Sequence, residues 1–192
     1  MRQSEHKINP FILNRCSKRA MTGEEIDNET LMSLFEAAKW APSSFNNQPC
    51  RFIYSKREDD KFEEFLGLLT DKNKSWAKNS SALIVVISRK YHEYNETPSI
   101  THSFEAGAAC QNLLIEGTSR NLVTHLMQGF DYGKAAELCK VPLNFKVEVM
   151  CSVGIPGDPK QLPVELQKAE KPTPRKLLKD IIMKHAFSEI KS

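Results

Sequence analysis

Apolar residues recur at two different spacings along this chain, and the two spacings predict both helices and strands. The clearest helical pattern is the apolar face Leu31, Leu34, Phe35 and Ala38. Asp27 precedes this face and is a suitable N-cap. Residues 82–88 instead form a continuous run of branched apolar residues, which is typical of a buried strand. The pattern therefore predicts a mixed α and β chain.

Weaker patterns extend this prediction over most of the sequence. Further strands are expected at Arg51–Ser55, Leu122–Met127 and Phe145–Ile155. Further helices are expected at Glu58–Leu69, Ile100–Arg120, near Gly133–Cys139, and at Arg175–His185. Residues 156–174 are rich in proline and charge, so we expect them to run across a surface. No internal repeat is found.

Composition agrees with one globular domain and excludes several functional classes. The chain has 192 residues, of which 40% are hydrophobic and 27% charged, and its net charge of +3 is too small to favour nucleic acid as a partner. No apolar run approaches membrane-spanning length, and Met1–Pro10 lacks a signal-peptide core. We expect a cytoplasmic protein that binds a small anionic ligand rather than nucleic acid or a membrane.

Cysteine and histidine spacing gives no support to a metal site or a thiol nucleophile. The five cysteines are odd in number and widely spaced, which predicts reduced structural thiols rather than a disulfide framework. The five histidines show no HExxH or paired-ligand spacing. A Cys–His pair such as Cys110 with His102 rests on nothing beyond the presence of both residues. No metal and no catalytic residue are assigned.

Two polar clusters are candidates for ligand binding. Residues 42–50, Pro-Ser-Ser-Phe-Asn-Asn-Gln-Pro-Cys, place hydroxyl and amide groups between two prolines, where they can hydrogen-bond a flat polar ligand. Residues 15–19, Arg-Cys-Ser-Lys-Arg, combine three cations with a hydroxyl, which suits a phosphate group. Each cluster alone is more often an ordinary turn or a solvated surface.

Together and in this order, the two clusters resemble the opening of the nitroreductase-like family of FMN-dependent oxidoreductases. The resemblance continues through Gly107–Leu114, Gln128–Phe130, Val141–Pro142, Val153–Pro156 and Pro172–Lys176. It covers nearly all of the chain after about Ile8. The ordered combination is far more specific than any one of its parts.

The resemblance implies how the chain binds FMN. Arg15 and Ser17, with Cys16 between them, would hold the flavin phosphate, and Arg175 would close over it. Arg19 would lie at the pyrimidine edge of the ring, where negative charge collects on reduction. Asn73 would hydrogen-bond the ring edge, and the backbone of Gly129 would approach the ring's other side.

The family also implies a fold and an assembly. The fold would be α+β, with a mainly antiparallel central sheet flanked by helices, and residues 1–192 would form one domain. Residues 1–9 would be a flexible or weakly packed N-terminus, and residues 156–192 a C-terminal extension exchanged across a homodimer. Pro42, Ser43, Ser44 and Asn46 would then act on the flavin of the other subunit.

The activity implied is hydride transfer from NADH or NADPH through FMN to an electron-poor acceptor such as a nitroaromatic or a quinone. Two alternatives remain open: a flavin-binding protein that stores or senses flavin without turnover, and an interaction domain that binds no flavin. Within the enzyme interpretation, the short chain favours a generalist reductase, because residues 91–99 are its only candidate lid.

The chain departs from the family pattern at three places. Cys50 stands where the family commonly has tryptophan, a change we expect to affect packing rather than chemistry. Asn121-Leu122-Val123 replaces a Gly-Leu-Gly turn. Asparagine tolerates the left-handed conformation, whereas Val123 does not suit a position that requires positive φ. Lysine pairs that some members carry at the C-terminal element are reduced here, with Thr173 two places before Arg175, which predicts weaker phosphate binding.

Overall fold

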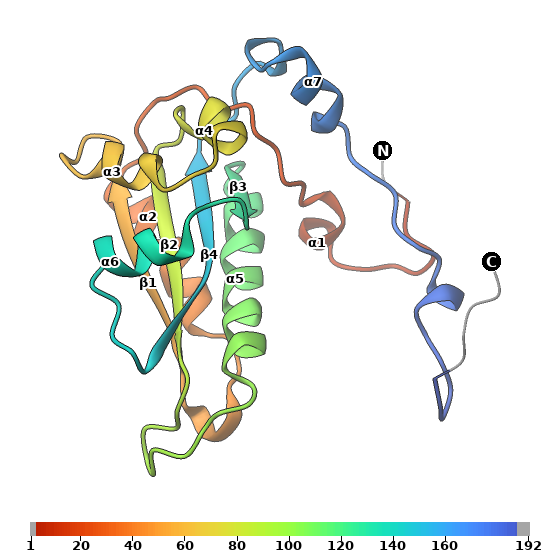
Figure 1. Ribbon diagram of the computed structural model, residues 1–192. Coiled ribbons are helices and arrows are strands. Elements are labelled where there is room, and N and C mark those ends of the chain that lie inside the picture. The colour runs from red at the N-terminus through yellow and green to blue at the C-terminus, as the bar shows by residue number, and fades with distance from the viewer. Residues whose placement is uncertain (1–2, 188–192) are drawn as a thin grey trace.

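A four-stranded antiparallel sheet forms the centre of the molecule in the computed structural model, which describes residues 3–187 (Figure 1). Its strands are β1 (Cys50–Lys56), β2 (Ala82–Arg89), β3 (Val123–Met127) and β4 (Phe145–Gly154). They lie in the order β1-β2-β4-β3, so that β1 and β3 are the two edge strands. Helices cover both faces of the sheet, which confirms the predicted α+β architecture.

Alternating side chains of β2 supply two separate hydrophobic cores. Leu83, Val85 and Ile87 point to one face, and Ala82, Ile84 and Val86 point to the other. Because both faces are covered, the strand is apolar from Ala82 to Ile87 instead of alternating with polar residues. This explains the continuous apolar run in the sequence.

Two long helices, α2 (Asn28–Lys39) and α5 (His102–Ser119), cover one face of the sheet. Asp27 caps α2 as predicted, since its Oδ1 accepts a hydrogen bond of 2.7 Å from the backbone N–H of Thr30. The last residues of α2 lead directly into the polar loop that begins at Pro42.

The other core, which contains Leu83, Val85 and Ile87, packs against four shorter helices: α3 (Phe62–Gly67), α4 (Asp71–Ala77), α6 (Tyr132–Leu138) and α7 (Val164–Gln167). The helix expected at residues 58–69 is shorter at both ends, because residues 57–61 form a turn in which Asp59 accepts the N–H of Lys56. The helix α4 was not predicted from the pattern.

Part of the C-terminal extension belongs to the body of the protein. Leu162 and Leu166 are buried in the core that contains Leu83, Val85 and Ile87. The backbone N–H of Gly157 also donates to the carbonyl of Ala20. The prediction that residues 156–174 only cross a surface is therefore wrong for this part. Leu162 anchors the segment before α7, and Leu166 anchors α7 itself.

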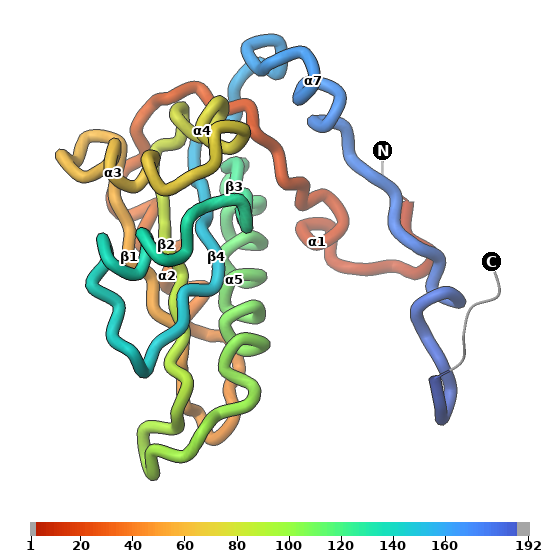
Figure 2. Tube along the Cα trace, in the orientation of Figure 1, coloured from red at the N-terminus to blue at the C-terminus, as the bar shows by residue number. Residues whose placement is uncertain are grey.

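The two ends of the chain leave the body on the same side (Figure 2). The N-terminal arm, residues 3–18, contains α1 (Pro10–Asn14), and the C-terminal arm comprises residues 171–187. Residues 3–9 are exposed, and the backbone N–H of Leu178 donates to Glu5 across the two arms. Met1 and Arg2, within the predicted flexible N-terminus, lie outside the described residues.

The helix predicted at Arg175–His185 is not formed. Only a 3₁₀ turn, η4 (Leu178–Asp180), is present there. The apolar residues that suggested the helix, including Ile181 and Ile182, are more than half exposed in the single chain. A short helix without a packing partner for its apolar face is marginal in water, so periodicity alone was not sufficient.

The turn between α5 and β3 accommodates its unusual sequence. Asn121 adopts a left-handed conformation with φ of 56°, as predicted for a replacement of glycine. Val123 is the first residue of β3, paired with Gly154, and so needs no positive φ. Within residues 3–187, no helix is both long and apolar enough to cross a membrane.

Candidate functional site

The basic cluster lies where the N-terminal arm joins the body. Nη1 of Arg15 donates a hydrogen bond of 3.1 Å to Oγ of Ser17, so the guanidinium and the hydroxyl lie next to each other. Both side chains are partly buried, and Cys16 between them is a free, half-buried thiol. A fixed guanidinium beside a hydroxyl offers the donors that a phosphate group accepts.

Arg19 continues this site toward the body. Its guanidinium carbon lies 6.0 Å from the centre of the Trp76 ring, and Trp76 is packed against His125 with ring centres 4.8 Å apart. The Nδ1 of His125 is 2.8 Å from the carbonyl oxygen of Lys18. The basic cluster, α4 and β3 are therefore joined through one arginine, one tryptophan and one histidine.

His125 is an uncharged member of this group at neutral pH. Burial lowers its pKa to about 4, against the hydrogen bond with Lys18, and the positive charges of Arg19 and Arg15 lower it further. The two arginines are consequently the positive charges of the site, because the imidazole between them stays neutral.

A second contact links α4 with the end of β3. The Nδ2 of Asn73 donates a hydrogen bond of 3.1 Å to the carbonyl of Gly129, and the backbone N–H of Thr70 donates to the same oxygen. A Cβ at residue 129 would lie 2.8 Å from Nδ2 of Asn73 and 3.1 Å from Oγ1 of Thr70. A side chain at residue 129 would therefore displace the amide of Asn73.

These contacts bring five of the predicted residues to one region: Arg15, Ser17, Arg19, Asn73 and Gly129. Asn73 and Trp76 are one turn apart on α4, which places them on adjoining parts of the same helix. The Nε1 of Trp76 is buried and has no hydrogen-bond partner among the described residues. An unpaired buried donor beside Arg19 fits a site that accepts an anionic, hydrogen-bonding group.

Three residues of this region were missed from the sequence: Trp76, His125 and Glu170. Glu170 lies in η3 (Lys168–Glu170), where its Oε1 accepts the backbone N–H of Arg19 at 2.9 Å and lies 3.7 Å from Nη1 of Arg19. It is separated from Arg19 by 151 positions, so no local spacing could have indicated the pair. For Trp76, its place one turn after Asn73 was an available signal.

The polar loop after α2 has a strained backbone. Phe45, Asn46 and Gln48 all have positive φ, at 53°, 54° and 46°. The hydroxyl of Ser43 accepts the N–H of Gln48, and the N–H of Ser44 donates to Glu105 at the first turn of α5. Non-glycine residues in this conformation cost free energy, and they concentrate at functional sites.

Asn47 holds this loop to the next one. Its Oδ1 accepts the N–H of Glu93 at 2.9 Å, and its Nδ2 donates to the carbonyl of Tyr91 at 3.5 Å. The side chain is buried, whereas Asn46 beside it is exposed. Of these two neighbouring amides, Asn47 has a structural role, and Asn46 presents its amide at the surface.

The two predicted half-sites are not brought together within one chain. The loop of residues 42–48 leads into β1, and the N–H of Arg89 donates to the carbonyl of Pro49 there. Gly129 instead follows β3. Because β1 and β3 are opposite edges of the sheet, Pro42, Ser43, Ser44 and Asn46 lie apart from Asn73 and Gly129.

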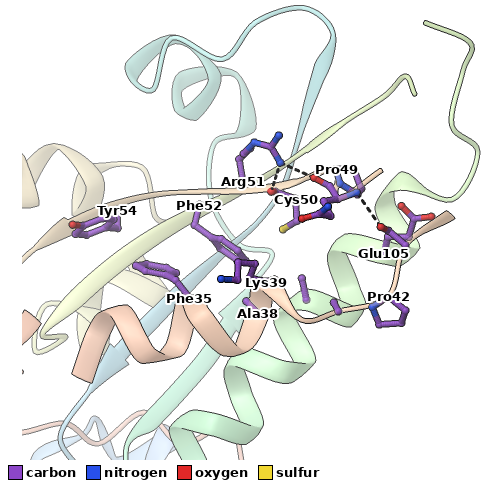
Figure 3. A pocket seen from close by; sticks show the side chains of 14 residues that line it. Phe35, Ala38, Lys39, Pro42, Pro49, Cys50, Arg51, Phe52, Tyr54 and Glu105 are labelled. Atoms are coloured by element: carbon purple, nitrogen blue, oxygen red, sulfur yellow. Dashed lines mark hydrogen bonds between the residues drawn. The ribbon is translucent and has the colours of Figure 1, made fainter. Parts of the chain in front are cut away.

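An apolar hollow opens next to this loop, with a cavity volume of about 340 Å³ (Figure 3). Phe35 and Ala38 from α2 and Phe52 and Tyr54 from β1 line it. Cys50, at the position where the resemblance expects tryptophan, also faces the hollow. A tryptophan at this position would fill more of the hollow than the cysteine does.

Arg175 lies in the C-terminal arm and is exposed. Its Nη1 donates to the hydroxyl of Thr173 at 3.1 Å and to the carbonyl of Pro174 at 3.2 Å. The contacts found for Arg175 are thus within its own segment, and its predicted role at a phosphate stays a prediction.

All five cysteines, which lie within the described residues, are free thiols. Burial raises the pKa of Cys110 to about 12, and it raises the pKa of Cys50 and of Cys151 as well. Thiols with raised pKa are poor nucleophiles at neutral pH.

The family model that matches this chain is described as the Nitroreductase family, and it matches residues 12–75 and 54–155. A solved structure described as an oxidoreductase containing FMN is 37% identical, with a TM-score of 0.94, and the alignment covers 98% of this chain and 97% of that chain. This similarity extends over both arms as well as the body.

More distant proteins agree on the fold. A nitroreductase family protein from Streptococcus pneumoniae TIGR4 has a TM-score of 0.73 at 18% identity, covering 91% of this chain and 98% of that chain. A Streptomyces coelicolor protein, provisionally named an NADH dehydrogenase/NAD(P)H nitroreductase, is 34% identical over 71 residues. That match covers 37% of this chain and 34% of the relative, so the chain spans about a third of that protein's length.

Proposed function

The chain belongs to the nitroreductase family, and from this premise we propose that it is an FMN-dependent oxidoreductase. The electron donor would be NADH or NADPH, and the acceptor an electron-poor compound such as a nitroaromatic or a quinone. The observation that carries the proposal is the convergence of Arg15, Ser17, Arg19, Asn73 and Gly129 around Trp76 and His125. FMN, when bound, supplies the hydride chemistry.

The arm residues would bind the phosphate of FMN. Arg15 and Ser17 already contact each other, so their donors are oriented before the ligand arrives. Arg175 would come from the C-terminal arm to close over the phosphate, a movement that its exposed position permits. Cys16 lies between Arg15 and Ser17, where its backbone would contribute to the same phosphate-binding site.

The body residues would bind the ring. Arg19 would place a positive charge at the pyrimidine edge, where it favours the more negative, reduced form. The amide of Asn73 would bind the ring edge, and Gly129 would let the backbone approach without a side chain. No side chain is assigned as acid or base, because the acceptor can take its proton from water.

A homodimer with flavin sites at the interface is part of the proposal. The loop with Pro42, Ser43, Ser44 and Asn46 would complete the partner's site, which is consistent with its location at the sheet edge opposite Gly129. The exposed apolar residues of the C-terminal arm, including Leu177, Ile181 and Ile182, would pack on the partner. The hollow beside α2 and β1 is an apolar surface of the kind that such an arm requires.

Localisation in the cytoplasm is likewise proposed. The five free cysteines agree with a reducing compartment. Flavin storage without turnover remains the alternative. Asn121 adopts the left-handed conformation and Val123 begins β3, so the turn at residues 121–123 does not favour storage over turnover.

Visible absorption spectroscopy tests the cofactor and the donor together. The purified protein is mixed with FMN, desalted and then titrated with NADH or NADPH without oxygen. We expect retained flavin absorbance that bleaches with one of the nucleotides. Flavin that is retained but does not bleach would support storage, and failure to retain flavin at saturating FMN would contradict the proposal.

Replacing Arg15 by alanine tests the phosphate site. We expect FMN affinity to fall by about tenfold or more, because a charge-assisted hydrogen bond contributes about 1.5–3 kcal/mol. Quenching of flavin fluorescence measures the dissociation constant. Lys7→Ala removes an exposed cation from the same arm and should leave the affinity unchanged. Equal affinities for the Arg15 variant and the wild type would exclude Arg15 from the site.

A further inference from the structure

We propose that Glu170 is a positioning residue that holds Arg19 at the flavin site and lowers the midpoint potential of the bound flavin by offsetting the arginine charge. This inference rests on the proposed function. It goes beyond it by assigning a role in setting the potential to a residue of the C-terminal extension, which no part of the resemblance indicated.

Glu170 contacts Arg19 at both its backbone and its side chain. The Oε1 of Glu170 accepts the N–H of Arg19 at 2.9 Å, and its Oε2 accepts the N–H of Ala20 at 3.3 Å. The same Oε1 lies 3.7 Å from Nη1 of Arg19. One carboxylate therefore fixes the direction of the main chain and of the guanidinium together.

Burial makes the charge of Glu170 effective. Its side chain is only 5% exposed, compared with 23% for Arg19. Water screens a charge at this depth poorly, so the carboxylate acts on its surroundings more strongly than a surface glutamate would. Glu165, on α7 five positions earlier, is exposed and provides a natural comparison.

The arginine that Glu170 holds is the one expected at the electron-accepting edge of the ring. Arg19 lies over Trp76, whose other neighbour is the neutral His125. The nearest ionised partner of Arg19 is therefore the Glu170 carboxylate. A lone arginine would favour the reduced flavin, and the paired arginine favours it less, because the buried negative charge opposes the positive one.

The test is a redox titration of the holoprotein carrying Glu170→Gln. Glutamine keeps one oxygen to accept the N–H of Arg19, and it removes the charge together with the weaker acceptor for the N–H of Ala20. We expect reduced FMN to gain about tenfold in affinity relative to oxidised FMN, a rise in midpoint potential of about 30 mV for a two-electron couple. Glu165→Gln is the matched control and should leave the potential at the wild-type value.

Further variants separate the effect of charge from a purely structural role. Arg19→Gln should lower the potential, and adding Glu170→Gln to that variant should bring it back toward the wild-type value, because the two charges offset each other. Glu170→Asp keeps the charge and should retain a potential near wild type. Thermal unfolding of the flavin-free variants records any loss of stability, which a structural role alone would cause without shifting the potential.

An unchanged potential in Glu170→Gln holoprotein would overturn the proposal. If that variant does not retain flavin, an unchanged potential in Arg19→Gln would overturn it equally, because there would then be no effect of the arginine charge for Glu170 to offset. Wild-type protein that binds no FMN would remove the proposed function itself, and this is measured first. Failure of the inference is thereby distinguished from failure of the function.

Discussion

Single residues at this site have roles set by their neighbours rather than by their type. Asn47 and Asn73 have the same amide, but Asn47 joins two loops of the backbone and Asn73 contacts Gly129 beside the basic cluster. His125 could titrate near neutral pH in water, but burial beside two arginines keeps it neutral. Changing the space or the charge around one side chain should therefore change its role.

Replacing Gly129 by alanine tests the close approach to Asn73. The new Cβ would lie 2.8 Å from the Asn73 amide nitrogen, so the amide must move. We expect a stability loss of about 1–3 kcal/mol and weaker FMN binding. Urea unfolding and fluorescence titration measure the two effects. Gly67→Ala has no atom within 4 Å of its new Cβ and is the control. Equal losses in both variants would contradict the close-packing argument.

The lowered pKa of His125 predicts how stability depends on pH. The unfolded chain takes up a proton near pH 6.5, and the folded protein does so only near pH 4. Between these values the unfolded state binds more protons, so stability falls as pH falls. We expect the wild type to lose about 2 kcal/mol more than His125→Gln between pH 7 and pH 5. Urea unfolding at both pH values measures this difference, and parallel losses would refute it.

At the scale of elements, the site depends on short segments whose positions are set by contacts distant in sequence. The seven residues of α4 supply both Asn73 and Trp76. The loop after α2 keeps its strained backbone through contacts with α5 and with residues 91–93. The predicted lid, residues 91–99, is thus tied to the loop of residues 42–48 by Asn47.

Replacing Asn47 by alanine should loosen both loops together. Two backbone groups would lose their partner in a buried place, at a cost of about 1–3 kcal/mol. We expect faster amide hydrogen exchange in residues 91–93 as well as in residues 43–48. Asn28→Ala, at an exposed position in α2, is the comparison. Faster exchange confined to residues 43–48 would show that Asn47 does not couple the loops.

In the whole molecule, the two arms are the segments that bear most directly on assembly. They extend from the body on one side (Figure 2). The C-terminal arm exposes large apolar side chains. Exposed apolar residues on an extended segment indicate an interaction surface more strongly than scattered ones on a compact body do. The proposed homodimer gives these residues a place to be buried.

Charged substitutions in the C-terminal arm test the dimer. Ile181→Asp and Ile182→Asp place a carboxylate on residues that are 57% and 63% exposed in the single chain. Light scattering should give a dimer mass for the wild type and a monomer mass for the double variant, with loss of flavin retention. Leu143→Asp, at a residue 94% exposed on the body, should stay dimeric. A monomeric wild type that retains FMN would contradict the interface site.

Much of the fold could be predicted from the sequence, because local patterns and caps were sufficient for it. The strands β1, β2, β3 and β4 appear within one or two residues of their predicted bounds. The Arg15–Arg19 cluster was also recognisable, since its members are neighbours in the chain. The helix α4 was missed because its seven residues are too few to show a period.

By itself, the sequence determined the strands, the long helices and the cap at Asp27, since each depends on residues within a few positions of one another. Tertiary structure alone decided which polar residues meet. It brought Glu170 to Arg19, Asn73 to Gly129 and His125 to Trp76. It also left residues 175–185 without their predicted helix. The physical reason is that burial and charge pairing act between segments distant in the chain, where spacing carries no information.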